Sequence, residues 1–209
     1  VSDLHDIQTI TQGFNALGVL YIADGHHRSA AASRVFADRM KRNKIEPNDS
    51  FLLVSFPEAE VKVFEYNRVV KDINGYSVAD FITRVSKEFD LVKKTEAIKP
   101  DQRNKFSMYL SGVWYSLSLR SPISDKLSVV EKLDISILTN LLLEPILGIG
   151  DPRIDPRIDF IGGIRGLVEL EKRVDSGDWS IAFALYPTSV QDLISVADAE
   201  EVMPPKSTW

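Results

Sequence analysis

The chain has 209 residues, 44% of them hydrophobic and 26% charged, and a formal net charge of −5. These values are typical of a folded globular protein and exclude an intrinsically disordered chain. The absence of cysteine excludes disulfides, thiolate catalysis and cysteine-ligated metal centres. The acidic balance argues against nucleic acid as a partner, and no apolar run approaches the roughly 18 residues of a membrane helix. We therefore expect a cytoplasmic protein without a membrane segment.

The first 70 residues predict two helices and three strands. Apolar spacing predicts a helix from about residue 5 to 17, and the run Val19–Ala23 (VLYIA) predicts a strand buried on both faces. A second helix is predicted from Arg28 to about Met40. Residues 51–56 and 61–70 then indicate the two strands of a hairpin.

The remaining residues continue this alternation of strands and helices. Ser77 is typical of the cap of a helix that ends near Phe89, and alternating polarity predicts a hairpin of residues 105–110 and 113–119. The section 75–120 could form a small inserted α/β lobe. The later predicted elements are a helix at 134–147, a strand at 157–161, a helix at 166–174, a strand at 180–185 and a helix at 189–197.

This order of elements predicts an α+β fold, with a mixed sheet flanked by helices. We expect residues 1–209 to form one domain, and we expect that domain to be the C-terminal part of a longer protein. The strongly apolar run Ile137–Leu147 is interpreted as core, with a homodimer interface as the alternative.

The segment DGHHR, between the predicted strand and the second helix, is the best candidate active site. It consists of Asp24, Gly25, His26, His27 and Arg28. The N–H groups of a helix's first turn attract anions, and Gly25 allows the backbone to bend sharply there. Arg28 offers a bidentate fork to phosphate, His26 and His27 can transfer protons, and Asp24 could act as a base or hold a phosphate-bound Mg²⁺. The segment therefore predicts a phosphate or nucleotide site.

Two other interpretations of this segment stay open. In the first, Asp24 is a polar helix cap and Arg28 forms a surface salt bridge. The second is a metal site, which adjacent histidines disfavour because they point apart in regular structure, and the remaining histidine is His5. We therefore expect no metal site built from protein ligands alone.

Other candidate anion contacts lie further along the chain. Gly162, Gly163 and Arg165 belong to a glycine-rich strand-to-helix junction that could cradle an anion through backbone N–H groups. The alternative there is a tight turn with close packing. Three single basic residues, a type that is usually a surface charge, could contact a substrate's carboxylate or phosphate: Arg68, Arg157 and Lys206.

Six segments along the whole chain resemble the domain of unknown function 1015 family. They are ADGHHR (23–28), NRVVKD (67–72), KLDISILTNLLLEPILG (132–148), DPRIDFIGGIRG (155–166), AFALYPT (182–188) and MPPKSTW (203–209). Because they occur in order, the resemblance is specific, but it implies no activity.

The DGHHR box is also similar to that of archaeal free serine kinases, which belong to the ParB-like/sulfiredoxin superfamily. This resemblance implies a ParB/sulfiredoxin-like element, ATP or ADP with Mg²⁺ as cofactor, and Asp24, His26 and His27 in catalytic roles. Those kinases use an acidic residue well upstream of the box. Only 23 residues precede Asp24 here, so we expect that acidic residue to lie outside this chain.

The leading hypothesis is a phosphotransferase that uses a nucleotide and acts on free serine or a similar small hydroxyl compound. The alternatives are a ParB-like regulatory module that binds nucleotide, and a non-catalytic dimeric scaffold.

Overall fold

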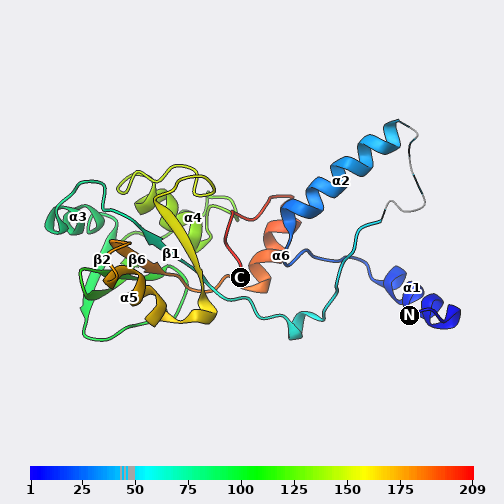
Figure 1. Cartoon of the computed structure of the whole chain (residues 1–209), viewed down its shortest axis with the longest axis horizontal. Helices are drawn as coiled ribbons and strands as arrows, with labels where there is room; N and C mark the ends of the chain where they lie inside the picture. Colours follow the sequence, from blue (N-terminus) through cyan, green and yellow to red (C-terminus); the bar gives the residue numbers. More distant parts are fainter. Residues whose placement is uncertain (43, 45, 47–49) are drawn as a thin grey trace. The chain divides into compact units, whose positions relative to one another are not determined.

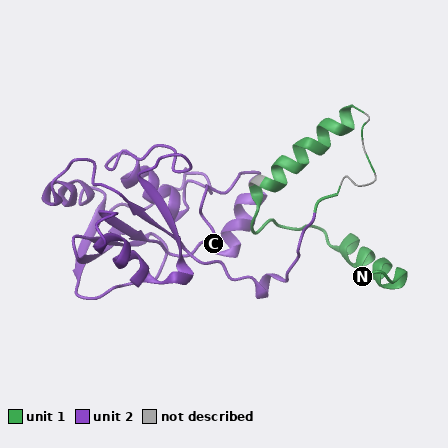
Figure 2. Cartoon of the chain, in the orientation of Figure 1, with its two compact units in different colours: residues 1–51 green, residues 52–209 purple. Residues whose placement is uncertain are grey.

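The computed structural model describes residues 1–42, 44, 46 and 50–209, and of His27 it describes the backbone alone. The chain falls into two compact units, residues 1–51 and residues 52–209 (Figure 2). Each unit is described by itself, so a single domain over residues 1–209 stays a prediction. No described helix is long and apolar enough to cross a bilayer.

The first unit contains two helices, α1 (Leu4–Ala16) and α2 (His26–Lys41), and both confirm the sequence prediction (Figure 1). Helix α1 begins where Asp3 caps it, because the Asp3 carboxylate accepts hydrogen bonds from two first-turn N–H groups at 2.9 and 3.1 Å. Helix α2 begins after Gly25, whose φ of +82° is left-handed.

The predicted strand Val19–Ala23 is wrong. These residues form no strand, and Val19 and Leu20 are 60% and 50% exposed rather than buried. A strand needs a neighbour to satisfy its backbone groups, and the described part of the first unit contains no other strand. The predicted hairpin of residues 51–70 is also wrong. Within this range only Tyr66–Val70 forms a strand, and Leu52 is 91% exposed.

The second unit is built on a six-stranded sheet in the order β2-β4-β3-β6-β1-β5 (Figure 1). All five described pairings are antiparallel, so the α+β class is confirmed with an antiparallel sheet instead of a mixed one. The strands are β1 (Tyr66–Val70), β2 (Phe89–Lys94), β3 (Lys105–Leu110), β4 (Val113–Leu119), β5 (Ile158–Gly162) and β6 (Ile181–Ala184). The predicted hairpin of β3 and β4 is confirmed residue for residue. Strand β3 also pairs with β6, so section 75–120 shares one sheet with the later strands.

Four helices lie on the two faces of this sheet, namely α3 (Val78–Val85), α4 (Asp134–Leu138), α5 (Leu167–Asp175) and α6 (Val190–Asp198). The alternation of side chains along each strand divides the core in two. One cluster joins Val69, Tyr109 and Trp114 to the apolar side of α5. The larger cluster, on the other face, includes Met108 and Phe183 together with buried residues of α3, α4 and α6.

The predicted helix 134–147 is confirmed as α4 followed by a π-helical turn, η2 (Thr139–Leu143). The regular helix ends before Pro145, which has no N–H to donate. Leu138, Leu142 and Leu147 are fully buried, which confirms the core interpretation of this apolar run. Two short 3₁₀ turns, η1 (Glu58–Glu60) and η3 (Gly163–Arg165), complete the described elements.

Candidate functional site

The first turn of α2 carries the DGHHR segment. Gly25 is its N-cap, no side chain caps it by a hydrogen bond, and the first turn contains no acidic residue. The first N–H groups of a helix have no partner inside the helix, so this turn presents backbone donors and the positive end of the helix dipole. The turn has the polarity that an anion requires, and a 16-residue helix lies behind it.

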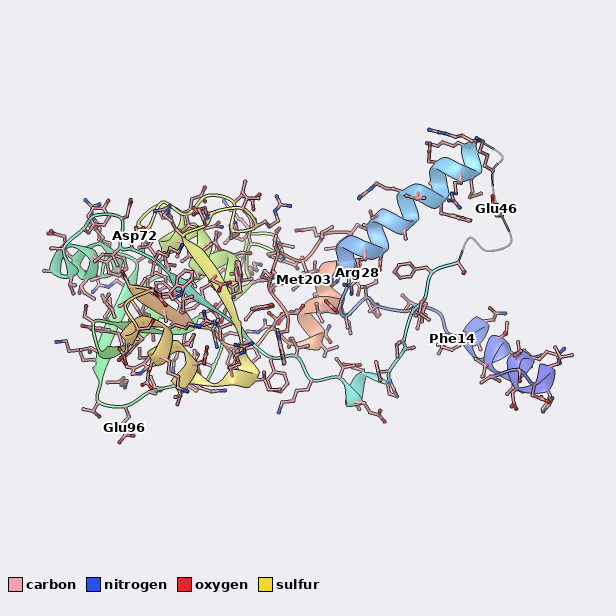
Figure 3. The ribbon with its side chains drawn as sticks, in the orientation of Figure 1. Phe14, Arg28, Glu46, Asp72, Glu96 and Met203 are labelled. Carbon is pink, nitrogen blue, oxygen red and sulfur yellow. The ribbon has the colours of Figure 1, made fainter. Side chains whose placement is uncertain are left out.

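The side chain of Arg28 folds back over this turn. Its Nη2 atom lies 3.6 Å from the Asp24 carboxylate, and a Cβ atom on Gly25 would lie 3.1 Å from the same nitrogen. Glycine is therefore favoured at position 25 chiefly by the left-handed backbone, while a Cβ there would shift the exposed guanidinium by only a few tenths of an ångström. Figure 3 shows Arg28 at the end of α2 where the helix begins.

The side chains of the segment differ in how exposed they are and in whether the structure describes them. The Asp24 and Arg28 side chains are 89% and 78% exposed, so their ion pair is weak and can be exchanged for another partner. His26 is half-buried at the first helical position. His27 occupies the second position of the helix, and its side chain lies outside the described residues. The role of each residue here stays a prediction.

Gly162 and Gly163 lie where β5 meets η3, and both are closely approached. A Cβ on Gly162 would lie 2.6 Å from the indole of Trp209, and a Cβ on Gly163 would lie 2.3 Å from the carboxyl carbon of Glu65. The Gly163 N–H donates to the Glu65 carbonyl at 2.8 Å. Close packing thus explains why both positions are glycine. The buried Glu65 carboxyl also disfavours the binding of an anion beside Gly163.

Arg68 lies inside β1 and is only 1% exposed, although a single basic residue is usually a surface charge. Its guanidinium donates to the backbone carbonyls of Tyr66 and Lys206, the latter at 2.7 Å, while its Nε has no partner among the described atoms. Burial lowers the pKa of Arg68 to about 9, and Tyr66 opposes that change. Arg68 therefore binds backbone carbonyls in this structure.

The structure places Arg68, Lys206, Gly162 and Gly163 beside residues 64–66 and 206–209, whereas the side chains of Arg157 and Arg165 pair with other residues. The Lys206 ammonium lies 5.6 Å from the centre of the Tyr66 ring. Residues 64 and 209 exchange backbone hydrogen bonds of 2.9 and 3.3 Å beside them. Arg157 instead donates to the carbonyls of residues 147 and 148 and pairs with Asp155 at 3.3 Å, and Arg165 lies 3.9 Å from the carboxylate of residue 169.

The sequence model of the family described as "Protein of unknown function (DUF1015)" matches residues 1–136, about two thirds of the chain. The chain belongs to this family. The match includes the DGHHR segment and Arg68, whereas the glycine-rich junction and Lys206 lie beyond it. Among curated proteins, none matches the chain.

Several solved structures resemble the chain weakly. Free serine kinase in complex with AMP is 13% identical, with 100% of this chain and 80% of that one covered and a TM-score of 0.47. A mutant of free serine kinase in complex with ADP is 15% identical, with 100% and 81% covered and a TM-score of 0.47. A conserved hypothetical protein from Pyrococcus furiosus is 17% identical, with 90% and 68% covered and a TM-score of 0.48. Likenesses at this level establish neither a shared fold nor a shared activity.

The sequence analysis missed one polar cleft in the second unit. It is lined by Arg103, Lys132, Leu133, Asp134, Tyr186, Pro187, Thr188 and Asp192. In the sequence, Asp134 is the first residue of the predicted helix 134–147. Its neighbours in the cleft come from distant parts of the chain, so no local pattern announces them.

Proposed function

We propose that this chain binds the phosphate groups of ATP or ADP at the first turn of α2 and transfers a phosphoryl group to a small hydroxyl compound, with free serine as the specific candidate. The observation that carries the proposal is the start of α2, which has neither a side-chain cap nor an acidic residue and lies beneath the Arg28 guanidinium. Backbone N–H groups at a helix start, a positive dipole end and a bidentate cation are the elements of a phosphate site.

In this proposal three residues of the segment, Arg28, His26 and Asp24, have chemical roles. Arg28 leaves its exposed pair with Asp24 and binds the phosphate oxygens. Oxygen of the acceptor hydroxyl forms a bond to the terminal phosphorus as the bridging P–O bond breaks, and its proton passes to His26 or Asp24. The described residues contain no cluster of three acidic or histidine side chains for a metal. Mg²⁺ would therefore be held mainly by the phosphates, with Asp24 as its protein ligand.

The resemblance of the DGHHR box to that of archaeal free serine kinases supports this choice over a plain helix cap. A capping Asp would accept hydrogen bonds from the first turn, but Gly25, not Asp24, occupies the N-cap position. Asp24 is therefore not the N-cap residue that the polar-cap interpretation requires.

The test is calorimetric titration of the chain with ATP, ADP, AMP and inorganic phosphate. Arg28→Ala removes charge-assisted hydrogen bonds and should weaken nucleotide binding by about 10- to 100-fold. Arg34→Ala is the matched control, since Arg34 is an exposed arginine of the same helix, more than a turn from its start. Equal loss in both variants, or no nucleotide binding by the unaltered chain, would refute the proposal.

Transfer is tested separately from binding. Phosphorus NMR of the chain with nucleotide, Mg²⁺ and serine should show a phosphomonoester signal that depends on Arg28. Binding without this signal would reject the transferase and favour the nucleotide-binding regulatory module.

A further inference from the structure

Lys206 lies in a tight turn of the second unit and has an unfavourable backbone conformation. Its φ is +56°, in the left-handed region that glycine and asparagine adopt easily and that costs other residues free energy. The Ser207 hydroxyl donates to the Pro204 carbonyl at 2.7 Å, which stabilises the turn from within. A lysine here therefore supplies something that glycine, the residue that this backbone favours, would not.

Two residues from distant parts of the chain hold this turn in place. The Arg68 guanidinium, which is 1% exposed, donates to the Lys206 carbonyl at 2.7 Å, and the Thr188 hydroxyl donates to the Ser207 carbonyl at 3.1 Å. Arg68 has no carboxylate partner among the described residues, so its hydrogen bonds to backbone carbonyls must offset the cost of burying its charge. The Lys206 side chain therefore starts from a fixed position.

The Lys206 ammonium lies over an aromatic ring and is not neutralised. It is 5.6 Å from the centre of the Tyr66 ring, and no described carboxylate forms an ion pair with it. Trp209 borders the same ring, because Gly162 is the register partner of Tyr66 and a Cβ on Gly162 would lie 2.6 Å from the indole. Lys206 is exposed and Trp209 is 47% exposed. An accessible cation and an accessible indole thus lie on two sides of one tyrosine.

We propose that Lys206 and Trp209 bind a small anion that carries a flat ring, either a nucleotide or an aromatic carboxylate. The Lys206 ammonium contacts the phosphate or carboxylate oxygens, and the ring of the ligand stacks on the indole of Trp209. The ammonium is then what the lysine supplies in a turn that favours glycine. The inference goes beyond the proposed phosphate site at α2 and shares no residue with it, so each can fail while the other stands.

Five small molecules test this combination of charge and ring. AMP and benzoate carry both, ribose 5-phosphate and acetate lack the ring, and adenosine lacks the charge. Each is titrated into the ¹⁵N-labelled chain, and the indole N–H signal of Trp209 reports binding. The indole N–H of Trp114, which donates to Glu171 at 2.8 Å, is the internal control. AMP or benzoate should shift the Trp209 signal at millimolar concentration, and the other three should bind at least about tenfold more weakly.

Two variants of Lys206 separate ligand binding from structure. Lys206→Met removes the charge and Lys206→Gly removes the whole side chain, so each should weaken binding of the better of AMP and benzoate by about tenfold or more. Lys206→Gly should also leave the midpoint of urea unfolding unchanged or raise it, because glycine suits the left-handed backbone. Lys71→Met is the matched control and should bind normally, since Lys71 is an exposed lysine 5.7 Å from the centre of the Trp179 ring.

The proposal is overturned if neither AMP nor benzoate shifts the Trp209 signal, or if the molecules that lack the ring or the charge bind as well. It is also overturned if Lys206→Met binds like the unaltered chain or if Lys71→Met loses as much binding. A lower urea midpoint for Lys206→Gly would assign the lysine a structural role and would overturn it too.

Discussion

Asp134→Asn should stabilise the second unit at neutral pH. The pKa of Asp134 is raised to about 6 from the ordinary 3.8, chiefly because burial disfavours its charged form. One unit of pKa difference corresponds to 1.36 kcal/mol, so ionisation of this carboxyl costs the folded state up to about 3 kcal/mol at pH 7. Asparagine has nearly the same shape and never ionises, so the variant avoids that cost and retains an acceptor for Asn104.

The sign of this effect sets its pH dependence. Between about pH 4 and pH 6 the folded protein keeps the Asp134 proton while the unfolded chain has lost it, so the contribution of Asp134 to stability falls as pH rises. Below pH 4 both states are protonated and the cost vanishes. The difference between Asp134→Asn and the unaltered chain should therefore grow from near zero at pH 4 to about 3 kcal/mol at pH 7.

Urea unfolding followed by tryptophan fluorescence measures this difference. All three tryptophans lie at positions 114, 179 and 209, so their emission reports on the second unit alone. Asp101→Asn is the control of opposite sign, because a hydrogen bond from Lys105 lowers the pKa of the exposed Asp101. If the difference in unfolding free energy between Asp134→Asn and the unaltered chain stays constant from pH 4 to pH 7, the inference that burial raises the pKa of Asp134 is refuted.

Three further substitutions test the packing of both units. Gly163→Ala places a methyl group 2.3 Å from the Glu65 carboxyl, so it should lower the free energy of unfolding in urea by about 1–3 kcal/mol. The same change in a Glu65→Ala background should lower it by much less. Arg68→Ala leaves a cavity and an unpaired Lys206 carbonyl, so it should lower the free energy of unfolding by about 3 kcal/mol or more. Arg68→Met fills the space and should lower it by less. Equal losses in the two variants would contradict the argument from burial. Gly25→Ala forces a side chain into a left-handed backbone and should lower the helicity of the first unit by circular dichroism, at a cost of about 1 kcal/mol.

The elements that the sequence predicts well have their determinants nearby. The hairpin of β3 and β4 was correct at every residue, because Ser111 and Gly112 both adopt positive φ in its turn and polarity alternates on either side. Ser77 caps α3, as its sequence pattern indicates, because its side chain accepts a hydrogen bond from the N–H group three residues on. Ser189 caps α6 in the same way, at the start of the helix predicted from residue 189. Turn and cap chemistry act over a few residues, so a single sequence contains them.

The errors concern residues whose environment is set by distant partners. Val19–Ala23 has strong strand propensity but no neighbouring strand in the described part of its unit, so propensity alone misleads. Strand β1 pairs with β5 and β6 instead of with the segment before it. Arg68 is charged, and charged residues are rarely buried, so its place in the core follows only from the carbonyls that the fold brings to it.

The same distinction separates the start of α2 from the polar cleft around Asp134. The start of α2 takes its chemistry from five consecutive residues, so the sequence revealed its parts and the structure added the missing cap and the position of the guanidinium. In the Asp134 cleft, Asn104 lies 30 positions from Asp134, and Arg103 lies 89 positions from its partner Asp192. Changing Arg28 alters one exposed turn and should leave tryptophan-detected unfolding unchanged, whereas changing the buried Asp134 should alter that unfolding.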